Sequence, residues 1–297
     1  MYLLIRLNVF TAVNYATMTF PYYQPLLQTL KPGGSIVAIG AATQEQPVGL
    51  ALAQISPDGD FAKVLSIFVD ASHRCTGIGT ALLTHLEQVL LRQGCTSANF
   101  VYTTGKPTTP ALECLLQKCG WSSPELRRFI GKATAKRVME APWMHRYSLP
   151  STFTIFPWCQ LTPDERIAIL LQQEAEEWYP ENLSAFAEEE NIELLNSLGL
   201  RYKGQVVGWM ITHRIAPDTI RYTSLFVKKE LQQMGRAIPL LAESIKLQDS
   251  NRIPNCIWMV LSDNAPMLSF MRRRLAPYMN EAVESRGSYK LLLRGYL

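Results

Sequence analysis

The chain has 297 residues, of which 47% are hydrophobic and 18% are charged. It is about twice as long as an ordinary domain, and so large an apolar share excludes disorder over any long stretch. The 29 basic and 25 acidic residues leave a net charge of +4, a small excess that does not indicate a nucleic-acid partner.

The first ten residues, MYLLIRLNVF, carry Arg6 inside an apolar run, and no small-residue cleavage site follows them. The sequence has no uninterrupted apolar run of about eighteen residues, the length that a membrane-spanning helix needs. We therefore expect a soluble, cytoplasmic protein with no membrane partner. The six cysteines form no CxxC pair, so we predict reduced and mostly buried thiols rather than disulfides.

Apolar runs rich in β-branched residues predict the strands of the first half of the chain. These strands cover residues 35–42, 48–55, 63–69 and 98–102. Helices are predicted at 77–92 and 110–119, and a linker with two prolines at 141–152. We therefore expect two domains, residues 1–148 and 149–297.

A helix-start signal opens the second half. Thr162 is a hydroxyl cap, Pro163 suits the first helical position and Glu165 can close a capping box, which together predict a helix at 163–177. Further strands are predicted at 198–202, 206–213, 220–227 and 257–261, and further helices at 235–247 and 266–275.

The two halves contain an internal repeat. The segment SIFVDASHRCTGIGTALL at 66–83 aligns with SLFVKKELQQMGRAIPLL at 224–241, at a constant offset of 158 residues. Upstream, QPVG at 46–49 is echoed by QVVG at 205–208. Because both halves show the same order of strands and helices, we predict the same mixed α/β fold for each.

The predicted turn between the strand at 63–69 and the helix at 77–92 contains two glycines. A helix start offers unpaired backbone N–H groups and a positive dipole end, so such a turn can hold a pyrophosphate. Gly77 and Gly79 have no Cβ to keep phosphate oxygens away from the amides, while Arg74 adds positive charge and Thr80 a hydroxyl. A purely structural turn is the alternative, since two glycines alone are a weak signal.

This turn resembles the signature of the GNAT superfamily of N-acetyltransferases: Arg or Gln, two residues, Gly, one residue, then Gly or Ala, directly after the fourth strand. The first half matches it with RCTGIG at 74–79, and the second with QQMGRA at 232–237. The resemblance covers nearly the whole chain. It implies two tandem GNAT domains, each a mixed, mostly antiparallel twisted sheet flanked by helices.

The resemblance also implies an activity, the transfer of acetyl from acetyl-CoA to a primary amine by direct attack in a ternary complex. The fourth strand of each half would pair with the acetyl and pantetheine portions, and each turn would hold the pyrophosphate. In the first half the implied cofactor-binding residues are Ile67, Phe68, Val69, Arg74, Cys75, Thr76, Gly77, Ile78, Gly79 and Thr80. In the second half they are Leu225, Phe226, Val227, Gln233, Gly235, Arg236 and Ala237. The second turn departs from the cleaner first one, because Arg236 separates its small residues and Pro239 follows in the helix.

Many GNAT enzymes place a tyrosine general acid on the helix after the fifth strand, but the matching positions here are Leu116 and Met271. Tyr102 on the fifth strand and Tyr222 on the second half's fourth strand are the candidate substitutes. The alternative for each is a packing role with a satisfied hydroxyl. The four histidines lack metal-ligand spacing, so no metal site is predicted, and only His213 falls where an acceptor would bind.

Eight glutamates stand between residues 174 and 193, interleaved with Trp178, Tyr179 and Phe186. If this segment walls the acceptor site, it would attract a cationic small-molecule or peptide amine. The alternative is a solvated acidic face. Two other functions stay open: an acyl-CoA-binding module without turnover, and a nucleic-acid-binding protein that uses basic runs such as arginines 272–274.

Overall fold

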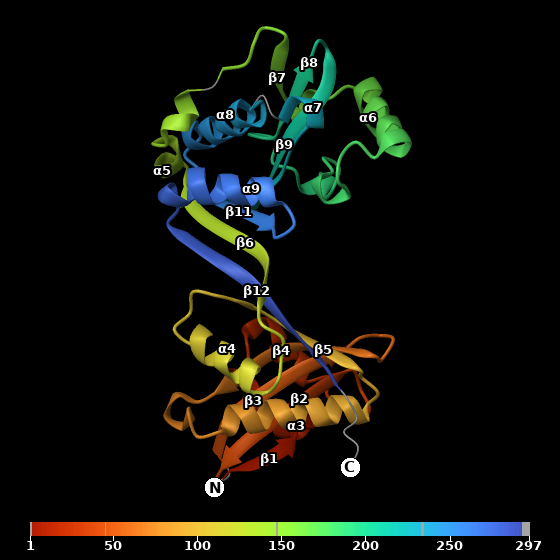
Figure 1. Ribbon diagram of the computed structural model, residues 1–297, viewed down its shortest axis with the longest axis vertical. Coiled ribbons are helices and arrows are strands. Elements are labelled where there is room, and N and C mark those ends of the chain that lie inside the picture. The colour runs from red at the N-terminus through yellow and green to blue at the C-terminus, as the bar shows by residue number, and fades with distance from the viewer. Residues whose placement is uncertain (1, 45, 147, 233–234, 293–297) are drawn as a thin grey trace. The chain divides into compact units, whose positions relative to one another are not determined.

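The computed structural model describes residues 2–44, 46–146, 148–232 and 235–292 (Figure 1). The chain divides into two compact units. Unit 1 comprises Met1–Arg127 and Glu284–Leu297, and unit 2 comprises Arg128–Val283. The predicted division after residue 148 differs from this one, because residues 128–148 belong to unit 2 and the C-terminal strand belongs to unit 1.

The strands of unit 1 follow the order β1-β2-β3-β4-β5-β12. Among the described residues, neighbouring strands pair antiparallel apart from β4 with β5, which are parallel. The bounds of these strands are β1 Leu3–Arg6, β2 Ile36–Thr43, β3 Gln46–Ile55, β4 Phe61–Val69, β5 Ser97–Thr103 and β12 Glu281–Leu291.

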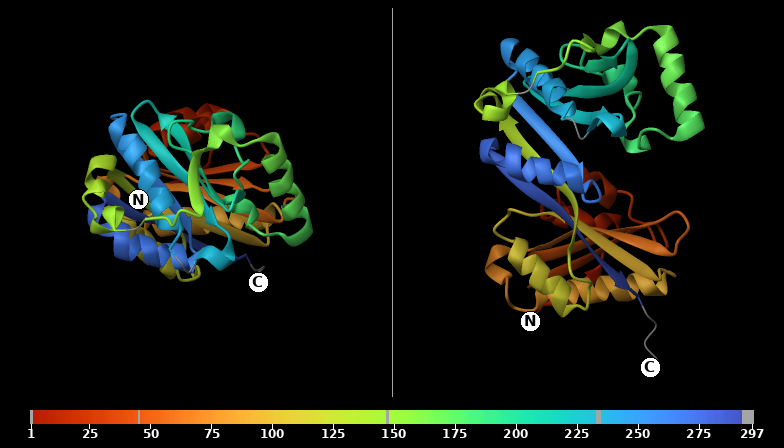
Figure 2. Two further views of the ribbon diagram at one scale, coloured as in Figure 1. Left: turned by 90° about the horizontal axis from the view of Figure 1, so that it is seen from above. Right: turned by 45° about the horizontal axis from the view of Figure 1, so that its top comes forward.

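Helices cover both faces of this sheet (Figure 2). Alternate strand residues such as Val37 and Ile39 pack against α3 (Ile78–Arg92) and α4 (Thr109–Lys118). Their neighbours on the other face pack against the N-terminal segment, which contains α1 (Val9–Ala12), α2 (Gln24–Leu27) and intervening 3-10 turns. Unit 1 is thus a three-layer arrangement with a core on each side of the sheet.

The strands of unit 2 follow the order β6-β11-β10-β9-β8-β7. Here the pairing of β10 with β11 is parallel, and the other described pairings are antiparallel. The bounds are β6 Glu125–Thr134, β7 Phe153–Pro157, β8 Leu198–Tyr202, β9 Gln205–Ala216, β10 Thr219–Val227 and β11 Asn255–Leu261.

One face of this sheet packs an aromatic cluster around the fully buried Trp209, with Phe226, Trp158 and Tyr179 against it. The helices of unit 2 are α5 Ala135–Met139, α6 Pro163–Glu176, α7 Lys229–Gln232, α8 Ala237–Ser250 and α9 Ala265–Phe270, which a π-helical turn continues to Leu275. The predicted capping box at the start of α6 is confirmed.

The two units repeat each other in strand register as well as in sequence. In unit 1, β4 pairs with β5 from Phe61↔Ser97 to Val64↔Phe100. In unit 2, β10 pairs with β11 from Thr219↔Asn255 to Tyr222↔Trp258, which are the same positions at the offset of 158 residues. The predicted mixed, mostly antiparallel fold of both halves is therefore confirmed.

The segment predicted as a linker, 141–152, packs on unit 2: Trp143 in it is buried, packs edge-on against Phe270 and donates a hydrogen bond to the Arg274 carbonyl. One prediction about the cysteines is wrong in detail. All six cysteines are free, as predicted, but they are not mostly buried, since three of them are exposed: Cys75, Cys114 and Cys159.

Candidate functional site

The turn after β4 has the form that the glycine pattern predicts. Its chain passes through left-handed backbone at Cys75 (φ 61°) and Gly77 (φ 87°) before α3 begins at Ile78. Arg74 folds back so that its Nε donates to the carbonyl of Val69, the last residue of β4, at 3.1 Å. This bond ties the turn to the end of the strand.

The turn suits an anionic ligand such as a diphosphate. The first N–H groups of α3 have no intrahelical acceptor, and its first turn carries no acidic residue that would compete for them. A Cβ at Gly77 would meet nothing within 4 Å, so left-handed backbone rather than crowding is the reason for glycine there. The residues of the turn are largely exposed, which leaves these amides open to a ligand.

Beside the turn, β4 separates from β5. The parallel pairing of the two strands ends at Val64, while Ile67, Phe68 and Val69 continue to pair with β3 on the other side. Backbone groups on the β5 side of these three residues are therefore free of the ladder. Such an open strand edge can pair with an amide-containing ligand such as pantetheine.

Unit 2 repeats the turn. Gln232 donates from Nε2 to the carbonyl of Val227 at 2.8 Å, the same bond at the same offset as that of Arg74. Gly235 is left-handed (φ 68°), and α8 begins at Ala237 with no acidic residue in its first turn. Arg236 lies over the Phe153 ring at 5.0 Å, and its buried Nε has no partner among the described residues. An anion at the start of α8 would satisfy that nitrogen.

The remaining cofactor-binding residues predicted for the second half, from its fourth strand and its turn, divide into three groups. Gln233 lies outside the described residues. Phe226 and Val227 are buried, and the Phe226 ring packs on Trp209 in the aromatic cluster. Leu225 is half-buried and lines a cavity.

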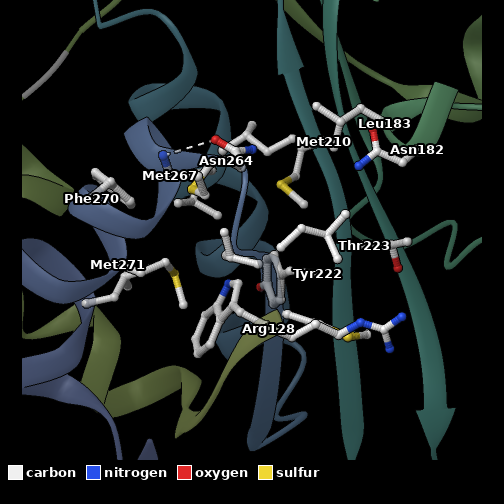
Figure 3. Close-up of a pocket in the computed structure, with 17 residues that line it drawn as sticks. Arg128, Asn182, Leu183, Met210, Tyr222, Thr223, Asn264, Met267, Phe270 and Met271 are labelled. Atoms are coloured by element: carbon white, nitrogen blue, oxygen red, sulfur yellow. Dashed lines mark hydrogen bonds between the residues drawn. The ribbon is translucent and has the colours of Figure 1, made fainter. Parts of the chain in front are cut away.

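This cavity, of about 250 Å³, lies in unit 2 where β10 and β11 diverge beyond Tyr222 and Trp258. Figure 3 shows Met267 and Met271, from α9 and the turn after it, on one side and Thr223 of β10 on the other. The lining is mostly apolar and includes four methionines: Met210, Met259, Met267 and Met271. Sequence analysis missed Thr223 and Asn182 as site residues, because neither belongs to a motif and only the fold brings them to the cavity.

Tyr102, the first catalytic candidate, is engaged in unit 1. Its hydroxyl donates to Glu113 on α4 at 2.8 Å, and Arg286 on β12 donates to the same carboxylate oxygen at 2.9 Å. Burial and the bond to Glu113 raise the pKa of Tyr102 well above its ordinary value. A phenol held in this way is a weak acid for a leaving thiolate.

Tyr222, the second candidate, is 4% exposed, and its ring lies along the cavity of unit 2. Its hydroxyl donates to Gln248 on α8 at 2.7 Å and accepts from Asn196 at 3.4 Å. Burial raises the pKa of Tyr222 well above its ordinary value. These contacts favour the packing role over the catalytic one.

The positions where related enzymes place a tyrosine acid are buried. Leu116 is 0% exposed on α4, and Met271 is 1% exposed and lines the cavity. Neither side chain carries a proton that it can donate, so a general acid in either unit must come from elsewhere.

The glutamate-rich segment at 174–193 is less negative than its sequence indicates, because arginines pair with several of its members. Glu188 pairs with Arg221, Glu189 with Arg166 and Glu193 with Arg214. These ion pairs connect the segment to α6 and to the strands β9 and β10. They also neutralise part of its negative charge, so its attraction for a cationic acceptor is weakened.

The comparisons with known proteins agree with this geometry. Residues 7–121 match the model of the acetyltransferase (GNAT) family. A tandem GNAT protein from the clavulanic acid biosynthesis pathway, solved without AcCoA, has a TM-score of 0.56 at 13% identity, over 99% of this chain and 100% of that one. A GCN5-related N-acetyltransferase from Sphaerobacter thermophilus has a TM-score of 0.55 at 17% identity, over 99% and 96%. A search of the curated proteins found no match.

Residues 7–121 thus match the GNAT acetyltransferase family, and the whole chain has the same fold as these tandem GNAT structures. No helix within the described residues is both long enough and apolar enough to cross a membrane. The described residues also contain no cluster of histidine, cysteine and carboxylate side chains that could hold a metal ion.

Proposed function

We propose that this protein is an acetyl-CoA-dependent N-acetyltransferase, which transfers the acetyl group to a primary amine of a small molecule or peptide by direct attack in a ternary complex. The observation that carries the proposal is the strand-to-helix turn found in both units. In each, a side chain ties the turn to the end of the preceding strand, and a left-handed glycine precedes a helix start without carboxylates.

The residues that would hold the cofactor follow from this arrangement. In unit 1 they are the backbone of Ile67, Phe68 and Val69 and the turn from Arg74 to Thr80. In unit 2 they are the backbone of Leu225 to Val227 and the turn residues Gly235 to Ala237. When bound, acetyl-CoA supplies a thioester whose carbonyl carbon is open to attack by an amine, and a backbone N–H on β4 or β10 would stabilise the charge on its oxygen.

Binding can be tested with a matched pair of variants. Gly79 is not left-handed, and a Cβ there would lie in ordinary contact with Leu115 at 3.5 Å, so Gly79→Glu introduces a carboxylate without backbone strain. Ala237→Glu does the same at the matching position of unit 2. We expect calorimetric titration with acetyl-CoA to show binding to the wild-type chain, and loss of each site only in the variant of that unit. No binding to the wild-type chain, or unchanged binding to both variants, would refute the proposed sites.

A second function, acyl-CoA binding without turnover, is favoured by one observation: Leu116 and Met271 replace the family's tyrosine, and the hydroxyls of Tyr102 and Tyr222 are already engaged. The two functions differ in one measurement. The wild-type chain is incubated with acetyl-CoA and a panel of primary amines, and release of the CoA thiol is followed. Amine-dependent release supports the transferase, whereas binding without release supports the second function.

A further inference from the structure

A hydroxyl and an imidazole meet at the edge of the cavity in unit 2. A register shift in β10 leaves Thr223 without an opposite residue on β9, and Thr223 lines the cavity (Figure 3). Its Oγ1 lies 2.7 Å from Nδ1 of His213 on β9 and accepts a hydrogen bond from Nε of Arg221 at 3.1 Å. His213 is only 2% exposed, so its imidazole contacts the Thr223 hydroxyl and is shielded from solvent.

The partners of His213 assign its protons. Nε2 faces the backbone carbonyl of Glu188 at 3.3 Å, and a carbonyl only accepts, so Nε2 carries the hydrogen. Nδ1 of the neutral ring is then an acceptor, and Thr223 donates its hydroxyl hydrogen to it. Of the two lone pairs on the Thr223 oxygen, Arg221 uses one, and the other is left for a ligand in the cavity.

The surroundings keep the imidazole neutral and ready to accept a proton. Burial lowers the pKa of His213 below its ordinary value of 6.5. The charged groups that face it are Arg221 on β10 and Glu188, which pair with each other at 2.6 Å. The next residue on β9, Arg214, pairs with Glu193.

Unit 1 lacks this pair although its backbone follows the same register. The residue left out of pairing by the corresponding shift in β4 is Leu65, which has no hydroxyl. In unit 2, His213 lies opposite Arg221 in the pairing of β9 with β10. At the matching position of unit 1, Gln54 lies opposite Lys63, so the imidazole is absent there. The hydroxyl–imidazole pair is thus a feature of unit 2 and not of the repeated fold.

A second difference between the units lies at Trp258. Trp258 lines it, and the buried Nε1 of this side chain has no hydrogen-bond partner among the described residues. The matching residue of unit 1 is Phe100, which has no N–H group. A buried donor without a partner destabilises the protein unless a ligand oxygen satisfies it, so the cavity is suited to a polar ligand.

We propose that Thr223 takes the proton from the attacking amine in unit 2, and that His213 is the positioning residue that receives the proton of Thr223 in turn. This inference rests on the proposed function. As the electron pair of the amine forms the C–N bond, the C–S bond of the thioester breaks with its pair on sulfur. The proton on nitrogen moves to Oγ1 of Thr223, whose own proton moves to Nδ1 of His213. The imidazolium later returns a proton through the Thr223 hydroxyl to the cavity, where the leaving thiolate accepts it.

The test uses the full chain with acetyl-CoA and methylamine, a small primary amine, because the ordinary pKa of an alkylamine, about 10.4, lies far above that of an imidazole. We expect His213→Gln and Thr223→Val each to lower kcat by about 10²-fold, the usual contribution of general-base catalysis. The acidic limb of the pH–rate profile, below pH 6.5 in the wild type, should disappear in His213→Gln. Thr223→Ser, which keeps the hydroxyl, should retain the activity, and Gln54→Ala at the matching position of unit 1 should change nothing.

Binding and spectroscopy separate this inference from the function on which it rests. Calorimetry should give the same Kd for acetyl-CoA in His213→Gln as in the wild type, and ¹⁵N NMR of the ligand-free chain should show His213 protonated on Nε2 alone. An active wild type with unchanged kcat and pH profile in both variants, or an Nδ1–H tautomer, would overturn the relay and leave the transferase standing. A wild type that binds acetyl-CoA but acetylates no amine would overturn the transferase itself.

Discussion

At the residue scale, the repeated glycine of QPVG and QVVG has a packing reason. A Cβ on Gly208 would lie 2.5 Å from the carbonyl oxygen of Phe226, and a Cβ on Gly49 would lie 3.0 Å from the carbonyl oxygen of Phe68. Both acceptor residues occupy the same position of the repeat. Glycine is therefore required where β3 and β9 approach the backbone of the next strand.

The contact at Gly208 predicts a measurable loss of stability. Because the obstacle is backbone, Gly208→Ala forces β9 and β10 apart, and we expect the free energy of unfolding to fall by about 1–3 kcal/mol. The control is Gly79→Ala, whose new methyl group would make only ordinary contacts at 3.5 Å. Urea denaturation of the two ligand-free variants measures the difference, and equal midpoints would contradict the packing explanation.

At the element scale, the Glu165 carboxylate stabilises the start of α6 through two contacts. Glu165 accepts from the backbone N–H of Thr162 at 2.9 Å, closing the capping box, and also pairs with Arg201 on β8. Its side chain is only 18% exposed. The Arg201 guanidinium, together with the Thr162 bonds, lowers the pKa of Glu165 from 4.5 to about 2. The helix start and β8 are thereby joined through one side chain.

This low pKa predicts an acid-sensitive contribution to stability. A carboxylate with a lowered folded-state pKa stabilises the protein fully above pH 4.5, and the contribution is lost as pH falls toward 2. We expect Glu165→Gln to lower the free energy of unfolding by about 1–3 kcal/mol at pH 7. The difference between variant and wild type should shrink between pH 4.5 and the lowest pH at which both still fold. A difference that is independent of pH would show that the charge of Glu165 contributes nothing.

The predicted strands and helices are all present, since strong apolar periodicity and the Thr162 cap are local signals that tertiary contacts do not override. Four strands are not placed by the sequence analysis: β1, β6, β7 and β12. The segments ELRRFIGKAT and EAVESRGSYKL of β6 and β12 are rich in charge and have few apolar residues, whereas LLIR and FTIFP of β1 and β7 are too short for a clear pattern. The glycine turns of the candidate site could be predicted, since a motif encodes them. Thr223 could not, because its place at the cavity depends on a register shift that no single segment of sequence encodes.

At the scale of the whole molecule, unit 1 is built from two separate parts of the chain. β12 pairs with β5 from Ser285↔Thr103 to Leu291↔Ser97, and Leu292 is buried in the core beneath α3. Lys290 on β12 also bonds Glu87 on α3 at 2.5 Å. Unit 2, in contrast, is one continuous stretch, within which Lys132 near its start pairs with Glu281 near its end.

This connectivity predicts which fragments fold. Residues 1–148, the first domain predicted from the sequence, lack β12. Strand β5 then becomes an open edge beside an incomplete core, and we expect this fragment to be unfolded or aggregated. Residues 1–127 joined by a short Gly/Ser linker to 284–297 restore the strand. The linker has little distance to cover, because a Cβ on Gly287 would lie only 2.7 Å from Cδ of Arg127.

Thermal unfolding followed by circular dichroism should give a cooperative transition for the joined fragment and for residues 128–283, and none for 1–148. A cooperative transition in 1–148 would mean that unit 1 folds without its C-terminal strand. The contacts of β12 would then add to a unit that is already folded, and they would not be required for its folding.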